Sequence, residues 1–231
     1  MVNILQAATE GIGVYTIAEA ARYARMPAAT LHAWFFGLGE RPPMQRGGIQ
    51  TEEFRAITFV DFVEALAIRS LRADRKISLQ KIRAAIRNAR DRYKVEHLFA
   101  RSDHRTVLIG SDLHIFLKDD PKNPVGLTGR DLGQKSITVC LESYMEDLEY
   151  DAAGMARIYT ALAYKNQKVI LDPRIHFGEP VIAENGFTAQ TLWQAAVAEG
   201  SIEKAAEIYE VSVAAVETAY RYFNRELGVA A

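Results

Sequence analysis

The sequence predicts a mainly α-helical fold with small β elements: an N-terminal winged helix-turn-helix, a small mixed α/β middle and a C-terminal three-helix unit that is itself helix-turn-helix-like. Three observations predict it. Apolar residues recur at helical spacing in the first and last thirds, short β-like runs alternate with polar turns in the middle, and no low-complexity linker or solenoid-type repeat interrupts the 231 residues. We therefore expect three segments, residues 1–94, 95–166 and 167–231.

Composition excludes several protein classes. The chain is 49% hydrophobic and 25% charged, which is the balance of a soluble globular protein and not of a collagen-like or disordered one. A single cysteine, Cys140, excludes a disulfide framework and a thiolate zinc site within one chain. The N-terminus lacks a basic region followed by an apolar one, and no stretch approaches the roughly 18 apolar residues of a membrane span, so we expect a cytoplasmic protein.

The formal net charge of −1 hides an uneven distribution. Residues 69–94 contain ten basic and two acidic side chains, whereas residues 184–226 contain three basic and seven acidic ones. Residues 141–151 add five acidic side chains and no basic one. A basic N-terminal half joined to an acidic C-terminal half is typical of a protein that binds a polyanion with one end and a second partner with the other. The alternative is a solvated helix face in each half.

Two helices separated by a short break are expected near the N-terminus. Thr16 to Glu19 is a capping box that opens the first, and Pro27 stands in the first turn of the second. Trp34 and Phe35 fall on the apolar stripe of the second helix, so we expect them in the core and not stacked on bases.

The rest of the first segment contains a loop and two more helices. Glycines and prolines between Gly39 and Gly48 exclude helix there and indicate a loop or a β-wing. Thr58 and Ser78 are capping residues, each followed by apolar residues at helical spacing, and so predict helices after each of them.

The middle segment has a mixed pattern. Val95–Ala100, Thr106–Ile109 and His114–Leu117 are β-like runs. Apolar residues at helical spacing between residues 137 and 148 predict an amphipathic helix, with Cys140 as a buried small hydrophobe on it. Asp151–Gly154 predicts a hairpin turn.

The third segment begins with a strand at Val169–Leu171, ended by Asp172-Pro173. Three helices follow, at Thr188–Ala198, Ser201–Tyr209 and Ser212–Leu227. The last two form a second helix-turn-helix pattern. Because this region is acidic, we favour a structural or protein-contact role for it over direct DNA contact.

The first helix pair has the spacing of a DNA reader. In a helix-turn-helix, the first helix holds the second so that its N-terminal residues enter the major groove. Here those residues are Ala28, Ala29, Thr30 and His32. The alanines allow close approach, and Thr30 and His32 can hydrogen-bond phosphates or base edges, although His32 is equally consistent with an ordinary surface residue. Arg41 and Arg46 are expected to contact phosphates from the following loop. Arg83, Arg87 and Arg90 recur at helical spacing and are equally consistent with a solvated helix face.

Four sequence blocks in order resemble the MerR-type winged helix-turn-helix family over roughly residues 14–87. They are Tyr15–Ala21, Pro27–Trp34, Phe54–Asp61 and Ser78–Ile82. The resemblance implies that Thr16 and Arg55 contact phosphates and that Trp34 fixes the recognition helix. Two features depart from the family: His32 stands where the family usually has Arg, and no long dimerising helix follows residue 94.

Residues 169–223 resemble a small domain family associated with VapB-like antitoxins. Its hallmark follows a strand and is matched here by Asp172, Pro173, Ile175, Gly178, Pro180, Val181 and Ile182, with three helices after it. One departure is that Asn185–Phe187 replace the usual Gly-Thr-Arg. Membership would imply an antitoxin of a type II toxin–antitoxin system, which masks a PIN-like ribonuclease toxin and binds its own promoter. The active sites of such toxins are carboxylate clusters that hold divalent metal, so an antitoxin works by covering that cleft.

Nothing in the sequence supports catalysis. The five histidines have no metal-ligand spacing, no glycine-rich phosphate loop follows a strand, and the acidic residues near Glu149 are better explained as a solvated face. We therefore expect no catalytic residue, no cofactor and no metal site.

Two binding hypotheses remain. The first is an antitoxin that binds operator DNA and a PIN-like toxin, and the second is a MerR-like regulator that senses a small ligand through residues 95–231. The charge asymmetry and the hallmark favour the first. A homodimer, or a larger complex with the toxin, is expected because helix-turn-helix proteins generally read paired half-sites. Candidate dimer surfaces are the β-runs of the middle segment and the last helix with Tyr220, Tyr222 and Phe223.

Overall fold

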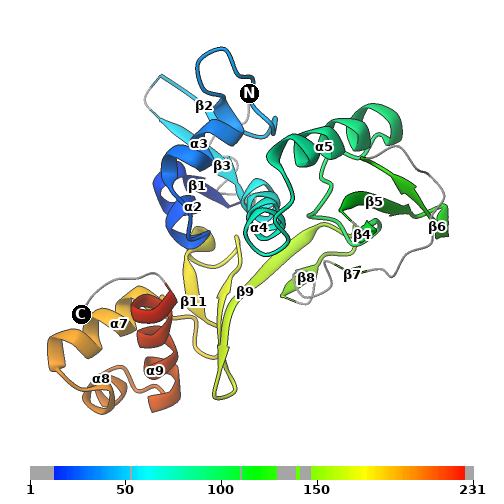
Figure 1. Ribbon diagram of the computed structural model, residues 1–231. Coiled ribbons are helices and arrows are strands. Elements are labelled where there is room, and N and C mark those ends of the chain that lie inside the picture. The colour runs from blue at the N-terminus through cyan, green and yellow to red at the C-terminus, as the bar shows by residue number, and fades with distance from the viewer. Residues whose placement is uncertain (1–12, 53, 110, 129–138, 141–146, 227–231) are drawn as a thin grey trace.

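The computed structural model describes residues 13–52, 54–109, 111–128, 139–140 and 147–226 (Figure 1). It is a mixed α/β structure with three small antiparallel sheets, in the orders β1-β3-β2, β6-β5-β4-β7 and β11-β10-β9-β8. The chain therefore has more β structure than the mainly α-helical fold that the sequence predicts. Within the described residues, no helix combines the length and apolar composition needed to cross a membrane.

The N-terminal elements follow the capping signals. Thr16 and Thr58 each form a complete capping box, with Glu19 and Asp61 respectively, and the Ser78 hydroxyl accepts from the backbone N–H of Lys81. The elements are β1 (Val14–Thr16), α2 (Ile17–Tyr23), α3 (Ala28–Phe36), β2 (Ile49–Gln50), β3 (Arg55–Thr58), α4 (Phe59–Ala73) and α5 (Leu79–Tyr93). Helices α2 and α3 are thus joined by a short turn and followed by a two-stranded hairpin, the arrangement expected for this segment.

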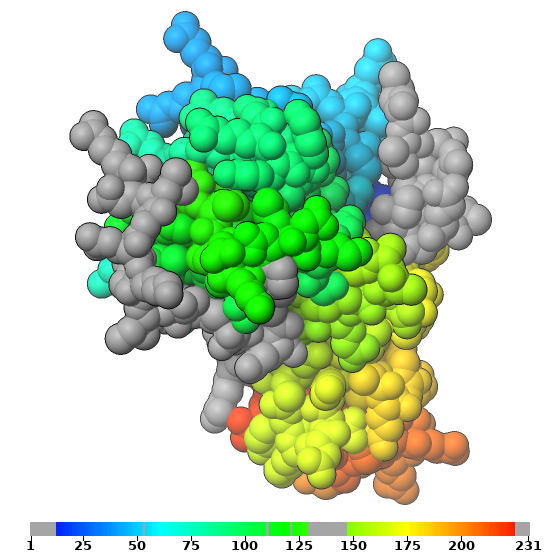
Figure 2. All heavy atoms as spheres, turned by 90° about the vertical axis from the view of Figure 1, so that its right-hand side faces the viewer, coloured from blue at the N-terminus to red at the C-terminus, as the bar shows by residue number. Residues whose placement is uncertain are grey.

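The middle segment forms two sheets. The first contains β4 (Arg105–Ile109), β5 (Asp112–Leu117), β6 (Asp120–Gly126) and β7 (Val139–Cys140). The second begins with β8 (Leu148–Tyr150) and β9 (Ala156–Tyr164), which the hairpin turn predicted at Asp151–Gly154 connects. In Figure 2, α5 lies directly above β4 and β5 on the face turned to the viewer.

Two predictions for the middle segment are wrong. Val95–Ala100 is not a strand, because the N–H groups of Phe99 and Ala100 donate to the buried Glu64 carboxylate instead of to a neighbouring strand. The helix predicted between residues 137 and 148 is not formed at Val139–Cys140, which pair with β4, or at Leu148, which begins β8. The remainder of that range lies outside the described residues.

The third segment continues the second sheet. It contains β10 (Gln167–Leu171), η1 (His176–Gly178), β11 (Pro180–Ile182), α7 (Ala189–Glu199), α8 (Ile202–Ile208), α9 (Val213–Arg221) and η2 (Tyr222–Glu226). Strand β10 pairs with β9, so one sheet crosses the expected boundary at residue 166. Figure 1 shows α7, α8 and α9 as a group at the end of the molecule opposite β2, connected to the rest through β9, β10 and β11.

One large core joins the first two segments. It runs from Tyr15 through α4 and α5 to Leu171, and it includes Trp34 and Phe35, as expected. Two smaller clusters lie among the C-terminal helices. Tyr222 and Phe223 are only 1% and 3% exposed, so the expectation that they lie on a dimer surface is wrong. Phe223 instead stacks on Trp193 and packs under the guanidinium of Arg22.

Candidate nucleic-acid interface

Helix α2 holds α3 in place, and Thr16 begins α2. The Thr16 hydroxyl accepts from the backbone N–H of Glu19 at 3.2 Å and donates to the Glu19 carboxylate at 2.7 Å. Thr16 is exposed, so its hydroxyl lies at the surface while it caps the helix. Trp34 fixes the other side of the pair, because its carbonyl accepts from the backbone N–H groups of Met44 and Gln45. Two ends of the helix-turn-helix are therefore tied by hydrogen bonds within the chain.

The first turn of α3 is exposed to solvent. Ala28 and Ala29 are exposed and Thr30 is half-buried. Pro27 is the N-cap and provides no side-chain hydrogen bond to the helix. The Thr30 N–H donates to the Pro27 carbonyl at 3.0 Å, so the backbone N–H groups of Ala28 and Ala29 are the ones from which a phosphate oxygen can accept at this helix start. The small side chains leave room for that approach.

His32, Phe36 and Arg55 meet between α3 and the β-hairpin. The Arg55 guanidinium contacts His32 Nε2, which accepts because a guanidinium only donates. The guanidinium also lies over the ring of Phe36, 5.5 Å from its centroid, and the rings of His32 and Phe36 are 5.2 Å apart. Arg55 itself remains exposed. His32 on α3 therefore orients an arginine of the β-hairpin, a contact between residues 23 positions apart that sequence spacing alone could not predict.

An arginine-lined groove lies between α5 and the loop that follows α3. Its volume is about 570 Å³, and its lining consists of Pro42, Pro43, Met44, Arg46, Gln80, Arg83, Arg87, Arg90 and Asp91. Arg83 Nη1 donates to the Pro42 carbonyl at 3.0 Å, which ties the loop to α5. Arg46 and Arg87 form no ion pair with any other described residue. Four guanidiniums around one groove, opposed by a single lining carboxylate, favour a polyanionic ligand.

The loop that supplies Arg46 is anchored on both sides of that residue. Gln45 is buried, and its Nε2 donates to Glu64 Oε2 at 3.1 Å. Gly47 packs directly against Asp61, since a Cβ at Gly47 would lie 1.8 Å from Asp61 Oδ1. Burial raises the pKa of Glu64 to about 8, against the opposing effect of hydrogen bonds from backbone N–H groups and from Gln45. Arg41, by contrast, is exposed and does not line the groove.

Several basic side chains of residues 69–94 make hydrogen bonds or ion pairs within the fold. Arg69 Nη1 donates to the Ala24 carbonyl at 2.8 Å, and Arg72 Nη1 donates to the Ile77 carbonyl at 3.2 Å. Lys81 pairs with Asp112 at 3.0 Å, and Arg90 pairs with Glu96 at 3.2 Å. The charge count along the sequence does not separate these roles. Arg83 and Arg90 line the groove and also make contacts within the fold, whereas Arg69 and Arg72 do not line it.

No metal-binding cluster of three or more His, Cys, Asp or Glu side chains occurs among the described residues. The largest concentration of buried carboxyl groups, Asp61 and Glu64, is occupied by capping and backbone hydrogen bonds. These contacts position the loop and offer no free ligand set.

The similarity of the chain to known proteins is distant. No protein-family model matches the chain. It is 26% identical over 195 residues to "Putative antitoxin VapB45" of Mycobacterium tuberculosis, across 76% of this chain and 79% of that protein. Its fold matches the crystal structure of Rv2018 from the same organism with a TM-score of 0.64 at 19% identity, covering 89% of this chain and 96% of that one. The chain is thus distantly similar to an antitoxin by name, and the structural match shows a shared fold.

Proposed function

We propose that this chain is the antitoxin of a type II toxin–antitoxin system, which neutralises a PIN-like ribonuclease toxin by direct binding and regulates its own operon by binding operator DNA. The observation that carries the proposal is the similarity to a protein named as an antitoxin, which extends over 195 residues and most of both chains. The hallmark between Asp172 and Ile182 supports the same assignment. It forms a hydrogen-bonded turn between β10 and β11, in which Asp172, Pro173 and Gly178 are buried.

In this proposal the three segments have separate tasks. Residues 1–94 form a MerR-like DNA-binding domain, residues 95–166 supply dimer or toxin contacts, and residues 167–231 form the antitoxin-type domain. The antitoxin functions as a homodimer or in a larger complex with its toxin. The proposed DNA contacts are Thr16, Ala28, Ala29, Thr30, His32, Arg41, Arg46 and Arg55.

The geometry supports different roles for these proposed contacts. Ala28, Ala29 and Thr30 present the open first turn of α3, while the exposed Arg55 guanidinium is oriented by His32 and Phe36. Arg46 extends the charge into the groove beside α5. Phosphate contacts of this kind supply affinity and register, and side chains on α3 supply whatever sequence preference there is.

The decisive experiment uses the full chain, its promoter fragment and the protein encoded by the adjacent reading frame. We expect retention of the promoter at modest salt, co-purification of the two proteins, and relief of the neighbour's growth inhibition and ribonuclease activity. A harmless neighbour that never associates with the chain contradicts the antitoxin assignment. Promoter binding that responds to a small metabolite and not to the neighbour would instead favour the ligand-sensing regulator.

A further inference from the structure

The turn between β10 and β11 presents an aromatic side chain to solvent. Phe177 is 66% exposed, more than any other aromatic residue among the large hydrophobics that the structure leaves at the surface. It belongs to η1, the short element within the hallmark segment. In Figure 1 this yellow turn lies below α2, on the side away from β2. It therefore lies on the opposite side of α2 from the β-hairpin that carries Arg55.

The backbone of this turn is held in an unfavourable conformation. His176, Phe177 and Gly178 have consecutive φ values of 45°, 56° and 89°. Left-handed backbone is readily adopted by glycine and tolerated by asparagine, but it costs roughly 1–2 kcal/mol for other L residues. Phe177 bears this cost while its ring stays largely in water. Folding of the isolated chain thus gains little from a phenylalanine here.

Hydrogen bonds hold the turn in this conformation. Asp172 is buried, and its Oδ1 accepts from the backbone N–H and Nε of Arg174 at 3.0 and 2.9 Å. The N–H groups of Ile175 and Gly178 donate within the turn at 2.9 Å each. Tyr15 Oη donates to the Gly178 carbonyl, also at 2.9 Å. A ring carried on such a constrained backbone loses little conformational entropy when it binds.

We infer that Phe177 is the anchor through which this chain binds its toxin, with the ring inserted into an apolar pocket on that protein. The inference rests on the proposed function and adds the place of contact. Rigid exposed aromatic side chains that enter a pocket are the usual centres of protein–protein binding energy. Arg174, three positions before the ring, has its Nε and Nη2 held by Asp172, so its guanidinium is fixed in direction and keeps donors for a partner.

A protein fits this surface better than the other occupants. Duplex DNA is disfavoured because the Arg174 charge is paired with Asp172 and because the exposed Glu179, two positions after the ring, adds a negative charge. A second copy is disfavoured for a geometric reason. The groove that could receive the ring lies among α7, α8 and α9, and it is lined by Ala196, Val197, Gly200, Ser201, Ile202, Glu203 and Tyr220. Because this groove and Phe177 are different surfaces, insertion would be a head-to-tail contact, which continues into chains or rings.

The test compares toxin affinity of the full-length unaltered chain with that of Phe177→Asn, using the purified product of the adjacent reading frame in calorimetric titrations. Asparagine removes the ring and tolerates the left-handed backbone, so the thermal midpoint should stay equal or rise. We expect the Kd to increase at least about 30-fold, as for a central hot-spot residue. Phe177→Gly should behave in the same way. Leu38→Asn, at a position 65% exposed on the loop after α3, is the matched control and should change the Kd less than about threefold.

Each other outcome overturns the inference in a recognisable way. An unchanged toxin Kd for both Phe177 variants removes the anchor and leaves the proposed function intact. An unchanged toxin Kd together with a smaller oligomer in light scattering would assign the ring to a second copy. A loss of operator affinity alone would assign it to DNA. If the unaltered chain gives a flat titration with the toxin, the proposed function fails and the anchor fails with it.

Discussion

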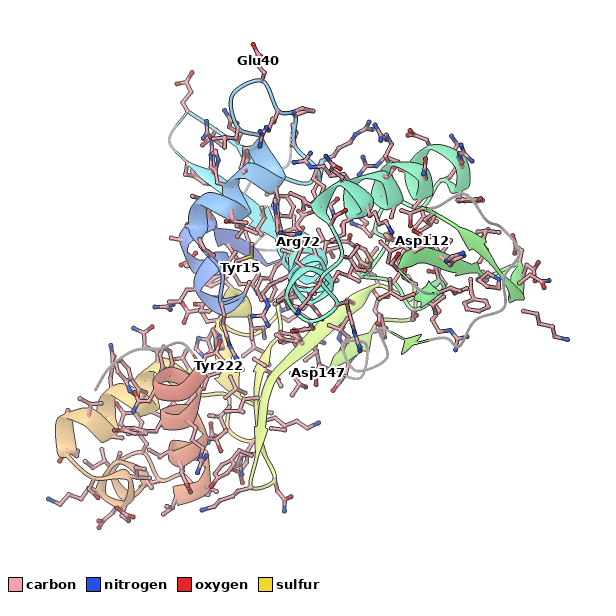
Figure 3. The ribbon with its side chains drawn as sticks, in the orientation of Figure 1. Tyr15, Glu40, Arg72, Asp112, Asp147 and Tyr222 are labelled. Atoms are coloured by element: carbon pink, nitrogen blue, oxygen red, sulfur yellow. The ribbon has the colours of Figure 1, made fainter. Side chains whose placement is uncertain are left out.

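Tyr15 and Gly178, 163 positions apart in the sequence, are joined by a hydrogen bond from the Tyr15 hydroxyl to the Gly178 carbonyl at 2.9 Å. Tyr15 directly precedes the N-cap of α2, and Gly178 closes the strained turn that presents Phe177. Tyr15 and Tyr222 both lie close to this junction between α2 and the C-terminal helices (Figure 3). The contact therefore connects the proposed DNA-binding and antitoxin-type domains through one buried side chain.

We expect Gly178→Ala to destabilise the protein by about 2–4 kcal/mol. Gly178 has a φ of +89°, and a Cβ there would lie 2.2 Å from Tyr15 Oη, so both the backbone and the hydroxyl would have to move. Gly186→Ala is the matched control, because Gly186 has a φ of +75° but no heavy atom within 4 Å of the added Cβ. Equilibrium denaturation measures both variants. Equal losses for the two would show that only backbone strain matters and that the Tyr15 contact contributes nothing.

Stability should also depend on pH through Glu64. Burial raises the pKa of this carboxyl from 4.5 to about 8, so the folded state binds its proton more tightly than the unfolded state. The resulting stabilisation is fully present below pH 4.5 and is lost as pH rises towards 8. Between those limits Glu64 should lower the folding equilibrium constant by up to about tenfold per pH unit.

Glu64→Gln tests this dependence. An amide oxygen can still accept from the N–H groups of Phe99 and Ala100, and the side chain carries no charge at any pH. We expect the free energy of unfolding of the variant, measured by urea denaturation, to change less between pH 5.5 and 8 than that of the unaltered chain. Asp119→Asn, at an exposed turn, is the control and should retain the original pH dependence. An identical pH profile for Glu64→Gln and the unaltered chain would contradict the assignment.

Local signals in the sequence predict much of the fold. The capping residues Thr16, Thr58 and Ser78 begin helices as expected, and the hairpin turn at Asp151–Gly154 connects β8 to β9. These features are specified within a few residues, because a cap or a turn needs only its neighbours. The same holds for Trp34 and Phe35, whose positions on a helical stripe predict their burial.

Long-range contacts explain what the sequence could not predict. Val95–Ala100 has the apolar content of a strand, but its backbone donors are taken by Glu64, about 35 positions earlier. Arg69 and Arg72 belong to the basic stretch, yet they donate to carbonyl groups inside the fold. Similarly, Arg46 reaches the arginines of α5 only because its neighbours Gln45 and Gly47 pack on α4. Charge counts along the chain carry no information on such partners.

Arg55→Ala should weaken operator binding about tenfold and make the slope of log K against log salt shallower by about 0.9, as expected when one phosphate contact is lost. The reason is that His32 and Phe36 hold the exposed guanidinium against α3. Fluorescence anisotropy at several salt concentrations measures both quantities. Arg105→Ala is the control, since Arg105 on β4 lies over the ring of Phe116 on β5 and is not a proposed DNA contact. If both substitutions shift affinity and slope alike, Arg55 acts only through net charge.

A similar prediction concerns the groove beside α5, whose Arg83, Arg87 and Arg90 are, from the sequence alone, equally consistent with a solvated helix face. Arg87 lines the groove with Arg46 and Arg83, while Arg92 is exposed on the same helix outside it. Arg87→Gln and Arg92→Gln remove the same charge, so long-range electrostatics are matched between them. We expect Arg87→Gln to weaken binding to the operator and to a scrambled duplex by the same factor and to reduce the salt slope by about 0.9, because a phosphate contact carries no sequence information. Arg92→Gln should leave both nearly unchanged. Equal effects of the two substitutions would mean that the duplex responds to the charge of α5 as a whole and does not enter the groove.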